Sequence, residues 1–301
     1  MKQELVNSAL DILRTKESKA KQIASLNKQQ AMQDKKFMAL YNTYIENMLE
    51  CAKGNIGKED LKISKEAMEA RLKELGIDSI EPKFSCTKCE DTGYSNGKQC
   101  SCLKKEISKI LIKKSGFPKL NKFKDSNFNI FSNKEEIEKI YSLMEKWCNK
   151  DSEKTLVYLL GNTGTGKTFL TSCMASEFIS QGKIVYLTTA FNLSQDFLKF
   201  HRSFDDKQKA DVFENYLSTE ILFIDDLGTE PIYNNVTREY LYLLINERKN
   251  KGLRTIITSN LEPVDIREKY DERIFSRIMD KDHSIILKLE SNDVRLKKKE
   301  V

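Results

Sequence analysis

The sequence predicts an α/β protein built on a parallel sheet, preceded by a helical N-terminal domain that contains a four-cysteine zinc knuckle. Three observations lead to this fold class. An apolar β-branched run, a glycine-rich loop and a helix-compatible run follow one another over residues 155–180. Five strand-like runs in all alternate with helical patterns, which is typical of a parallel sheet flanked by helices. Four cysteines are clustered between residues 86 and 102.

Length and composition limit the class of protein. The 301 residues suggest about two domains, and the charged fraction of 32% indicates a globular chain with a charged surface. No apolar run approaches the ~20 residues of a membrane span, and the N-terminus lacks an apolar signal core. We therefore expect a cytoplasmic protein with no membrane partner. Its seven cysteines should stay reduced unless a metal binds them.

The N-terminal domain is expected to be helical and basic at its end. Residues 1–50 and 65–75 show apolar positions at helical spacing, and residues 103–114 predict a basic helix. These helices favour either a small bundle or a module that docks a partner. Because the composition changes after residue 115, we predict an N-terminal domain over residues 1–115 and a nucleotide-binding domain over residues 116–301.

The four clustered cysteines predict a structural metal site. Cys86 and Cys89 are separated by two residues, and Cys100 and Cys102 by one. Four thiolates at this spacing suit a tetrahedral Zn²⁺, and a redox pair would need a βαβ context that the sequence lacks here. A closed site of four cysteines leaves no open position, so we assign it no catalysis.

The glycine-rich loop matches the phosphate-binding P-loop pattern, in the strand–loop–helix context that the pattern requires. Its backbone N–H groups and the following helix N-terminus suit phosphate oxygens. Lys167 would reach the β- and γ-phosphates of ATP, and the Thr168 hydroxyl would bind Mg²⁺. The residues expected to bind the nucleotide are Gly161, Asn162, Thr163, Gly164, Thr165, Gly166, Lys167, Thr168 and Phe169.

Two further strand ends carry polar side chains. The run over residues 221–226 predicts a buried strand that ends in Asp225 and Asp226, as in a Walker B motif. Asp225 would hold Mg²⁺, and Asp226 would orient or deprotonate the attacking water. Asn260 ends the next strand and can contact the γ-phosphate or that water, although an asparagine there is also a common turn residue. A helix before residue 147 is expected to start at Ser132.

The order GNTGTGKT, ILFIDDLG, TIITSN and ERIFSRI resembles the bacterial replicative-helicase loaders of the DnaC and DnaI type and the related IstB-type ATPases. This resemblance covers about residues 116–301 and implies a lidless AAA+ ATPase domain. By the same resemblance, Asn260 matches sensor 1, Arg277 the arginine finger that completes a neighbour's site, and Arg295 sensor 2. Arg273 is a weaker candidate for a role in trans. Asp226 stands where many AAA+ proteins have glutamate, which implies slow turnover.

The resemblance implies an ATP-dependent helicase loader of DNA replication initiation. Its partners would be the hexameric replicative helicase, single-stranded DNA, the replication initiator and further copies of this chain. The segment over residues 191–217 would follow the DNA path through its basic side chains and aromatic rings. An amphipathic helix with a solvated basic face is the equally simple alternative. A transposition helper ATPase and a zinc-binding, nucleotide-dependent adaptor with little turnover are the rival functions.

Overall fold

Two compact units make up the chain. The computed structural model describes residues 3–115, 120–203 and 213–291. One unit is Leu10–Lys98, and the other combines Met1–Ala9 with Gln99–Val301. The division therefore lies 17 residues before the predicted boundary after residue 115, whose following residues 116–119 lie outside the described part. The difference arises because α4 (Ser101–Ser115) packs against the edge strand of the sheet.

A buried hydroxyl on α4 bonds the backbone of this edge strand. Ser108 is fully buried, and its Oγ accepts a hydrogen bond from the Val185 N–H at 3.0 Å. Val185 begins β4, which lies at one end of the strand order. An edge strand exposes unpaired backbone groups, and a covering helix protects them. The predicted basic helix is thus confirmed, and it belongs to the same unit as the nucleotide motifs.

The helical unit begins with two helices where the sequence predicted one over residues 1–50. The chain turns at Asp34, whose carboxylate accepts from the Phe37 N–H at 2.7 Å and caps the second helix. The next helix starts at Lys58, earlier than predicted, because the Asp60 carboxylate accepts from the Gly57 N–H at 3.2 Å. The helices are α1 (Gln3–Ala31), α2 (Lys35–Ala52) and α3 (Lys58–Glu74), and a hairpin of β1 (Tyr94–Ser95) and β2 (Lys98–Gln99) follows.

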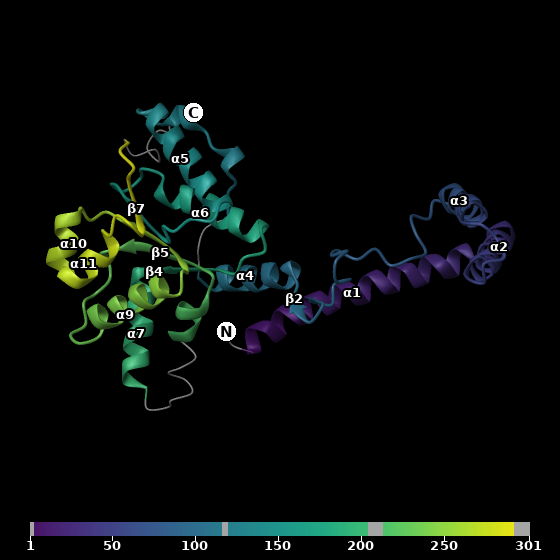
Figure 1. Ribbon diagram of the computed structural model, residues 1–301, viewed down its shortest axis with the longest axis horizontal. Helices are drawn as coiled ribbons and strands as arrows, with labels where there is room; N and C mark the ends of the chain where they lie inside the picture. The colour runs from purple at the N-terminus through teal and green to yellow at the C-terminus, as the bar shows by residue number, and fades with distance from the viewer. Residues whose placement is uncertain (1–2, 116–119, 204–212, 292–301) are drawn as a thin grey trace. The chain divides into compact units, whose positions relative to one another are not determined.

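A five-stranded parallel sheet organises the other unit (Figure 1). Its strand order is β4-β5-β6-β3-β7. All five strands lie where the sequence predicted them, because each is a short apolar, β-branched run. The parallel order brings the carboxyl ends of β3, β5 and β6 to one edge. The strands are β3 (Leu156–Leu160), β4 (Val185–Thr189), β5 (Ile221–Leu227), β6 (Arg254–Ser259) and β7 (Ser284–Lys288).

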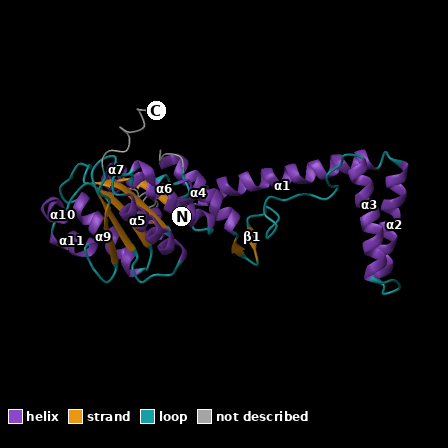
Figure 2. Cartoon of the chain, turned by 90° about the horizontal axis from the view of Figure 1, so that it is seen from above, coloured by secondary structure: helices purple, strands orange, loops and turns teal. Residues whose placement is uncertain are grey.

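Helices cover both faces of this sheet, shown with orange strands in Figure 2. Val157 and Leu159 face the core under α5 and α6, whereas Tyr158 and Leu160 face the core under the remaining helices. This alternation follows from the two-residue repeat of a strand. The helices are α5 (Lys134–Asn149), α6 (Lys167–Ser180), α7 (Ala190–Arg202), α9 (Thr237–Asn250), α10 (Pro263–Lys269) and α11 (Glu272–Ile278), with 3₁₀ turns η1 (Phe123–Asp125) and η2 (Phe128–Ile130).

The predicted start of α5 at Ser132 is wrong by one residue. Asn133 is the N-cap, and no side-chain cap bond forms there. Its amide instead donates to the Glu136 carboxylate at 3.0 Å, so the acid that would complete a capping box is already engaged elsewhere. Within the described residues, no helix has the length and apolar character that crossing a membrane would require.

A fully buried arginine bonds the amino-terminal ends of two strands of the sheet. The Arg248 guanidinium donates to the carbonyls of Tyr216 and Thr219 at 2.6 and 2.8 Å, to the Thr255 hydroxyl at 2.9 Å and to the Arg254 carbonyl at 2.6 Å. Burial lowers its pKa to about 9. These bonds join α9 to the amino-terminal ends of β5 and β6, and so stabilise the position of both strands in the sheet.

Candidate nucleotide-binding site

The P-loop connects β3 to α6 through glycines whose backbone other residues could not adopt. Gly166, the N-cap of α6, has φ of 95°. A Cβ on Gly161 would lie 2.4 Å from the Leu289 carbonyl oxygen, so a side chain is excluded there by the close approach of the chain after β7. The loop N–H groups and the α6 N-terminus therefore share one concave surface, as phosphate binding requires.

Lys167 is held at this surface by three oxygen atoms. Its side chain is buried, and Nζ donates to the Gly161 carbonyl at 2.5 Å, the Asn162 carbonyl at 3.0 Å and Asn260 Oδ1 at 2.7 Å. The structure thus brings together the predicted P-loop lysine and the predicted sensor asparagine, which are 93 residues apart in sequence. A phosphate oxygen would compete with Asn260 for the same ammonium group.

The two acids of β5 have different surroundings. Asp225 is half-buried, and its Oδ1 accepts from the Thr258 hydroxyl at 2.5 Å. Burial, reinforced by the neighbouring carboxylate, raises the pKa of Asp225 above its ordinary value. A bound cation would offset the free-energy cost of burying the charged carboxylate, so Asp225 suits the role of a magnesium ligand. Asp226 is exposed, has φ of 55°, and lines the same cavity as Thr168.

The cavity beside the P-loop encloses ≈ 680 Å³ and has one apolar wall. Ile130, Phe131, Tyr141 and Phe169 contribute the apolar part of the lining, and Lys167 belongs to the polar part. Tyr141 contacts Phe169 with ring centroids 6.4 Å apart. An apolar, aromatic lining beside a phosphate-binding loop suits a nucleotide base. Sequence reasoning missed the residues before α6, although the aromatic residues between positions 123 and 141 were a visible signal.

The two arginines of α11 lie together and away from this cavity. The Arg273 guanidinium lies 5.2 Å from the Tyr242 ring centroid, and that of Arg277 lies 5.9 Å from it. Arg273 is 61% exposed and pairs with Asp271 at 3.2 Å. Arg277 is half-buried, and its Nε has no hydrogen-bond partner in the described structure. Neither arginine lines the described cavity beside the P-loop. Arg295 lies outside the described residues.

The predicted DNA-contacting segment is only partly described. Phe197 is buried, and it packs with Phe200 against Phe213 and Tyr240, so these two rings belong to the core rather than to a base-stacking surface. The aromatic part of the prediction is therefore wrong for them, because α7 turns its apolar face to the sheet. Lys199 pairs with Asp196 at 3.3 Å. Phe204, Lys207 and Lys209 lie outside the described residues.

The four predicted metal ligands converge. The sulfur atoms of Cys86, Cys89, Cys100 and Cys102 all lie within 4.8 Å of one another. The Asp91 carboxylate, which sequence reasoning missed, accepts from the N–H groups of Ser85 and Cys86 at 2.7 and 2.9 Å. It is almost fully buried and folds the first turn around the sulfur atoms. Four converging thiols are the donor set of a structural zinc site.

Two curated proteins match parts of this sequence. The replicative helicase loader DnaI of Bacillus subtilis is 23% identical over 125 residues, which are 42% of this chain and 39% of that protein. A chromosomal replication initiator protein DnaA of Campylobacter jejuni is 29% identical over 131 residues, 43% of this chain and 28% of that protein. The matched part thus spans well under half the length of these relatives.

Two solved structures match part of this chain. A crystal structure of DnaI is 18% identical, with a TM-score of 0.45, and the match covers 58% of this chain and 90% of that one. The DnaC helicase loader is 20% identical, with a TM-score of 0.45, over 51% of this chain and 89% of that one. The family described as IstB-like ATP binding protein matches residues 103–301, well over half of the sequence. The chain therefore belongs to the IstB-like ATP-binding protein family.

Proposed function

We propose that this protein is an ATPase that loads the replicative DNA helicase, with ATP binding and hydrolysis switching its assembly and release on single-stranded DNA. The observation that carries the proposal is the contact of Lys167 with Asn260 at the P-loop, beside a cavity that Thr168 and Asp226 also line. The sequence similarity to a helicase loader supports the choice of partner. Membership in an ATP-binding family supports the nucleotide.

In this proposal each residue at the strand tips has one role. Lys167 neutralises the β- and γ-phosphates, and Thr168 and Asp225 hold Mg²⁺, which offsets phosphate charge when bound. Asp226 orients the attacking water. Asn260 senses the γ-phosphate, because that phosphate replaces Asn260 as a partner of Lys167. Arg277 completes the site of a neighbouring copy, so the active form is an ATP-dependent homo-oligomer. Arg295 would act as sensor 2.

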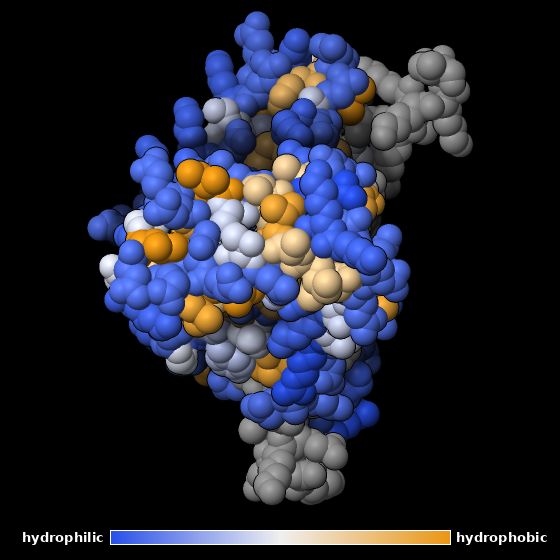
Figure 3. All heavy atoms as spheres, turned by 90° about the vertical axis from the view of Figure 1, so that its right-hand side faces the viewer, coloured by the Kyte–Doolittle hydropathy of each residue, from blue (hydrophilic) through white to orange (hydrophobic). Residues whose placement is uncertain are grey.

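The N-terminal unit would dock the helicase. Ile23 and Leu26 lie three residues apart on α1, so they share one face of the helix, and they are 59% and 56% exposed. Figure 3 shows that hydrophobic side chains reach the surface of this protein between hydrophilic ones. The cysteine cluster would hold one structural Zn²⁺ and stabilise the chain beside this unit.

Co-purification tests the function. The full chain, incubated with Mg²⁺ and a non-hydrolysable ATP analogue, should retain the hexameric helicase from its own lysate. The Ile23→Ser/Leu26→Ser variant should lose at least about tenfold of this binding, because two apolar anchors are removed. Leu143→Ser, which removes an exposed apolar side chain from the other unit, is the control and should bind normally. Retention of no helicase by the wild type would refute the proposal.

A transposition helper is the second candidate, because the matching family is described by its IstB-like members. Both candidates use the same nucleotide site, so turnover does not separate them. The same co-purification does: a transposase in place of a hexameric helicase would favour the second candidate. An adaptor with little turnover would bind ATP and its partner, and would show no hydrolysis with single-stranded DNA present.

A further inference from the structure

Two side chains hold the turn after β5 in shape, one close in sequence and one from a distant segment. Asp226, near the end of β5, has φ of 55°, and Gly228, in the turn, has φ of 109°. The Gly228 N–H donates to the Glu230 carboxylate at 2.8 Å, and the Gly228 carbonyl accepts from the Lys269 ammonium. Both backbone polar groups of Gly228 are therefore bound by side chains. This fixes the turn that carries the exposed carboxylate of Asp226.

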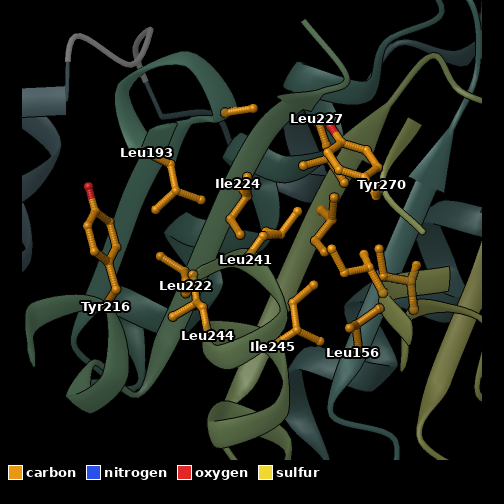
Figure 4. Packing of buried hydrophobic residues seen from close by; sticks show 14 of the residues in the cluster. Leu156, Leu193, Tyr216, Leu222, Ile224, Leu227, Leu241, Leu244, Ile245 and Tyr270 are labelled. Atoms are coloured by element: carbon orange, nitrogen blue, oxygen red, sulfur yellow. The ribbon is translucent and has the colours of Figure 1, made fainter. Parts of the chain in front are cut away.

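Glu230 is a buried carboxylate with neutral partners. It is 4% exposed, and its second oxygen accepts from the hydroxyl of Tyr270, which is fully buried. No ion pair joins Glu230 to a basic side chain within the described ranges. Figure 4 shows Tyr270 at the Leu227 end of the apolar cluster, next to this turn. A buried carboxylate is costly unless it is fully hydrogen-bonded, so two well-placed donors matter.

Tyr270 also marks the start of the helix that carries the two arginines. The next residue, Asp271, is the N-cap of α11, and its carboxylate accepts from the Ile274 N–H at 3.0 Å. Arg273 and Arg277 follow on this helix. A displacement of Tyr270 therefore moves the first turn of α11, because only one residue separates them.

We propose that Glu230 and Tyr270 are positioning residues that couple the turn carrying Asp226 to the helix carrying Arg273 and Arg277. The inference rests on the proposed ATPase function. A shift of Asp226 toward nucleotide changes the Gly228 backbone, and the bond between Glu230 and Tyr270 transmits this change to α11. The arginines that a copy offers to its neighbour are then adjusted by the nucleotide in its own site.

Tyr270→Phe tests the coupling because it removes one hydroxyl and keeps the ring. Turnover of the full-length variant, measured with single-stranded DNA, should fall about tenfold in kcat, with KM and ATP affinity changed less than about threefold. Tyr216→Phe is the matched control, because Tyr216, although it lies in the segment 191–217, is buried in the core and has no surface to offer to DNA. Its hydroxyl is also buried and donates to a carboxylate, that of Asp196 at 2.7 Å, away from the P-loop. It should lower the melting temperature similarly and leave kcat unchanged.

A mixing assay measures the effect on the arginine helix. Lys167→Ala copies cannot hydrolyse ATP but supply arginines, so they should restore turnover to Arg277→Ala copies. Adding Tyr270→Phe to the Lys167→Ala copies should weaken this rescue about tenfold, whereas adding Tyr216→Phe should not. Lys269→Met removes the bond from the Lys269 ammonium to the Gly228 carbonyl. Because the Lys269 side chain is only half-buried, this variant should still fold. It should also lower kcat at constant KM.

The outcomes separate this inference from the proposed function. A wild type that binds ATP but never hydrolyses it would refute the ATPase proposal, and the inference with it. If the wild type hydrolyses ATP, and Tyr270→Phe and Lys269→Met leave both kcat and the rescue unchanged, only the coupling is overturned. Equal losses in Tyr270→Phe and Tyr216→Phe would also overturn it, because both would then reflect general loosening.

Discussion

The helical unit and the sheet unit differ in how they bury apolar side chains. The sheet unit has a large core on each face of its strands, whereas the described core of the helical unit centres on Ala31, Phe37, Met68, Leu72 and Ile77. Eight of the thirteen large exposed hydrophobic residues in the described structure lie within Leu10–Lys98, less than a third of the chain, and five lie elsewhere. The helical unit therefore gains less from burial per residue.

Two arginines illustrate the same difference. Arg248 of the sheet unit is fully buried and bonds backbone carbonyls within the core. Arg71 of the helical unit is 22% exposed, and it binds both oxygens of Asp34, at 3.0 and 2.7 Å. The sheet unit is stabilised by a core with an internal polar anchor, and the helical unit by a smaller core and by ion pairs near its surface. Variants that change one unit while the other serves as the reference can test this difference.

The largest effect is expected at the P-loop. Lys167→Ala should reduce ATP turnover by on the order of 10² or more, because the ammonium group that faces the phosphates is lost. Arg277→Ala should bind ATP nearly normally and lose turnover. Mixing the two variants should restore some activity if arginines act in trans. A steady-state ATPase assay checks this, and a lack of rescue at every mixing ratio contradicts a shared site.

Loss of the metal site should loosen the cysteine segment and leave the nucleotide site intact. Metal analysis of the purified wild type should find one zinc per chain. Cys89→Ser should lose it and increase proteolytic cleavage around residues 84–100, while ATP binding stays within about twofold of wild type. Cys148→Ser, which alters a buried thiol of the sheet unit, is the control and should retain zinc. A wild-type protein that is well folded without any metal would contradict the zinc hypothesis.

Arg248→Met tests the internal anchor of the sheet unit. It should lower the free energy of unfolding by roughly 3–5 kcal/mol, because buried carbonyl and hydroxyl acceptors lose their donors. Lys249→Met, one residue away, removes a mostly buried ion pair with Asp280 and should cost roughly 1 kcal/mol. Denaturant unfolding monitored at Trp147, in the sheet unit, compares them. Equal destabilisation by both variants would show that Arg248 has no special role.

Sequence patterns predicted the local features and missed the long-range ones. The individual strands, the P-loop and the cysteine cluster each depend on residues close in sequence, and their placement was predictable. The turn at Asp34 was not, because its capping competes with helical periodicity that continues on both sides. Phe197 looked available for stacking on bases, but tertiary packing decides which face of an amphipathic helix is buried.

The site itself was predictable to the extent that its residues belong to motifs. The contact between Lys167 and Asn260 follows from the parallel order of β3 and β6, which the motif order implies. The bond between Glu230 and Tyr270 joins positions 40 residues apart, and neither residue lies within the motifs quoted for the resemblance. Only the folded chain reveals such a pair, because no local pattern specifies which buried hydroxyl meets which carboxylate.

The smallest effect is expected at the Asp34–Arg71 pair of the helical unit. The hydrogen bonds from Arg71 and from the Phe37 N–H hold the pKa of Asp34 at about 2, below its ordinary 3.8. A depressed carboxyl pKa contributes stability that is present above pH 3.8 and is lost as pH falls toward 2. Asp34→Asn keeps an N-cap acceptor but loses the charge that pairs with Arg71. We therefore expect α2 and α3 to be less stable at neutral pH in this variant. Their stability should also depend less on pH between 3.8 and 2. Hydrogen exchange of the α2 amides across this range measures it, with Asp11→Asn, whose partner Arg14 is largely exposed, as the control. The same pH dependence in wild type and Asp34→Asn would mean that this pair does not stabilise the helical unit.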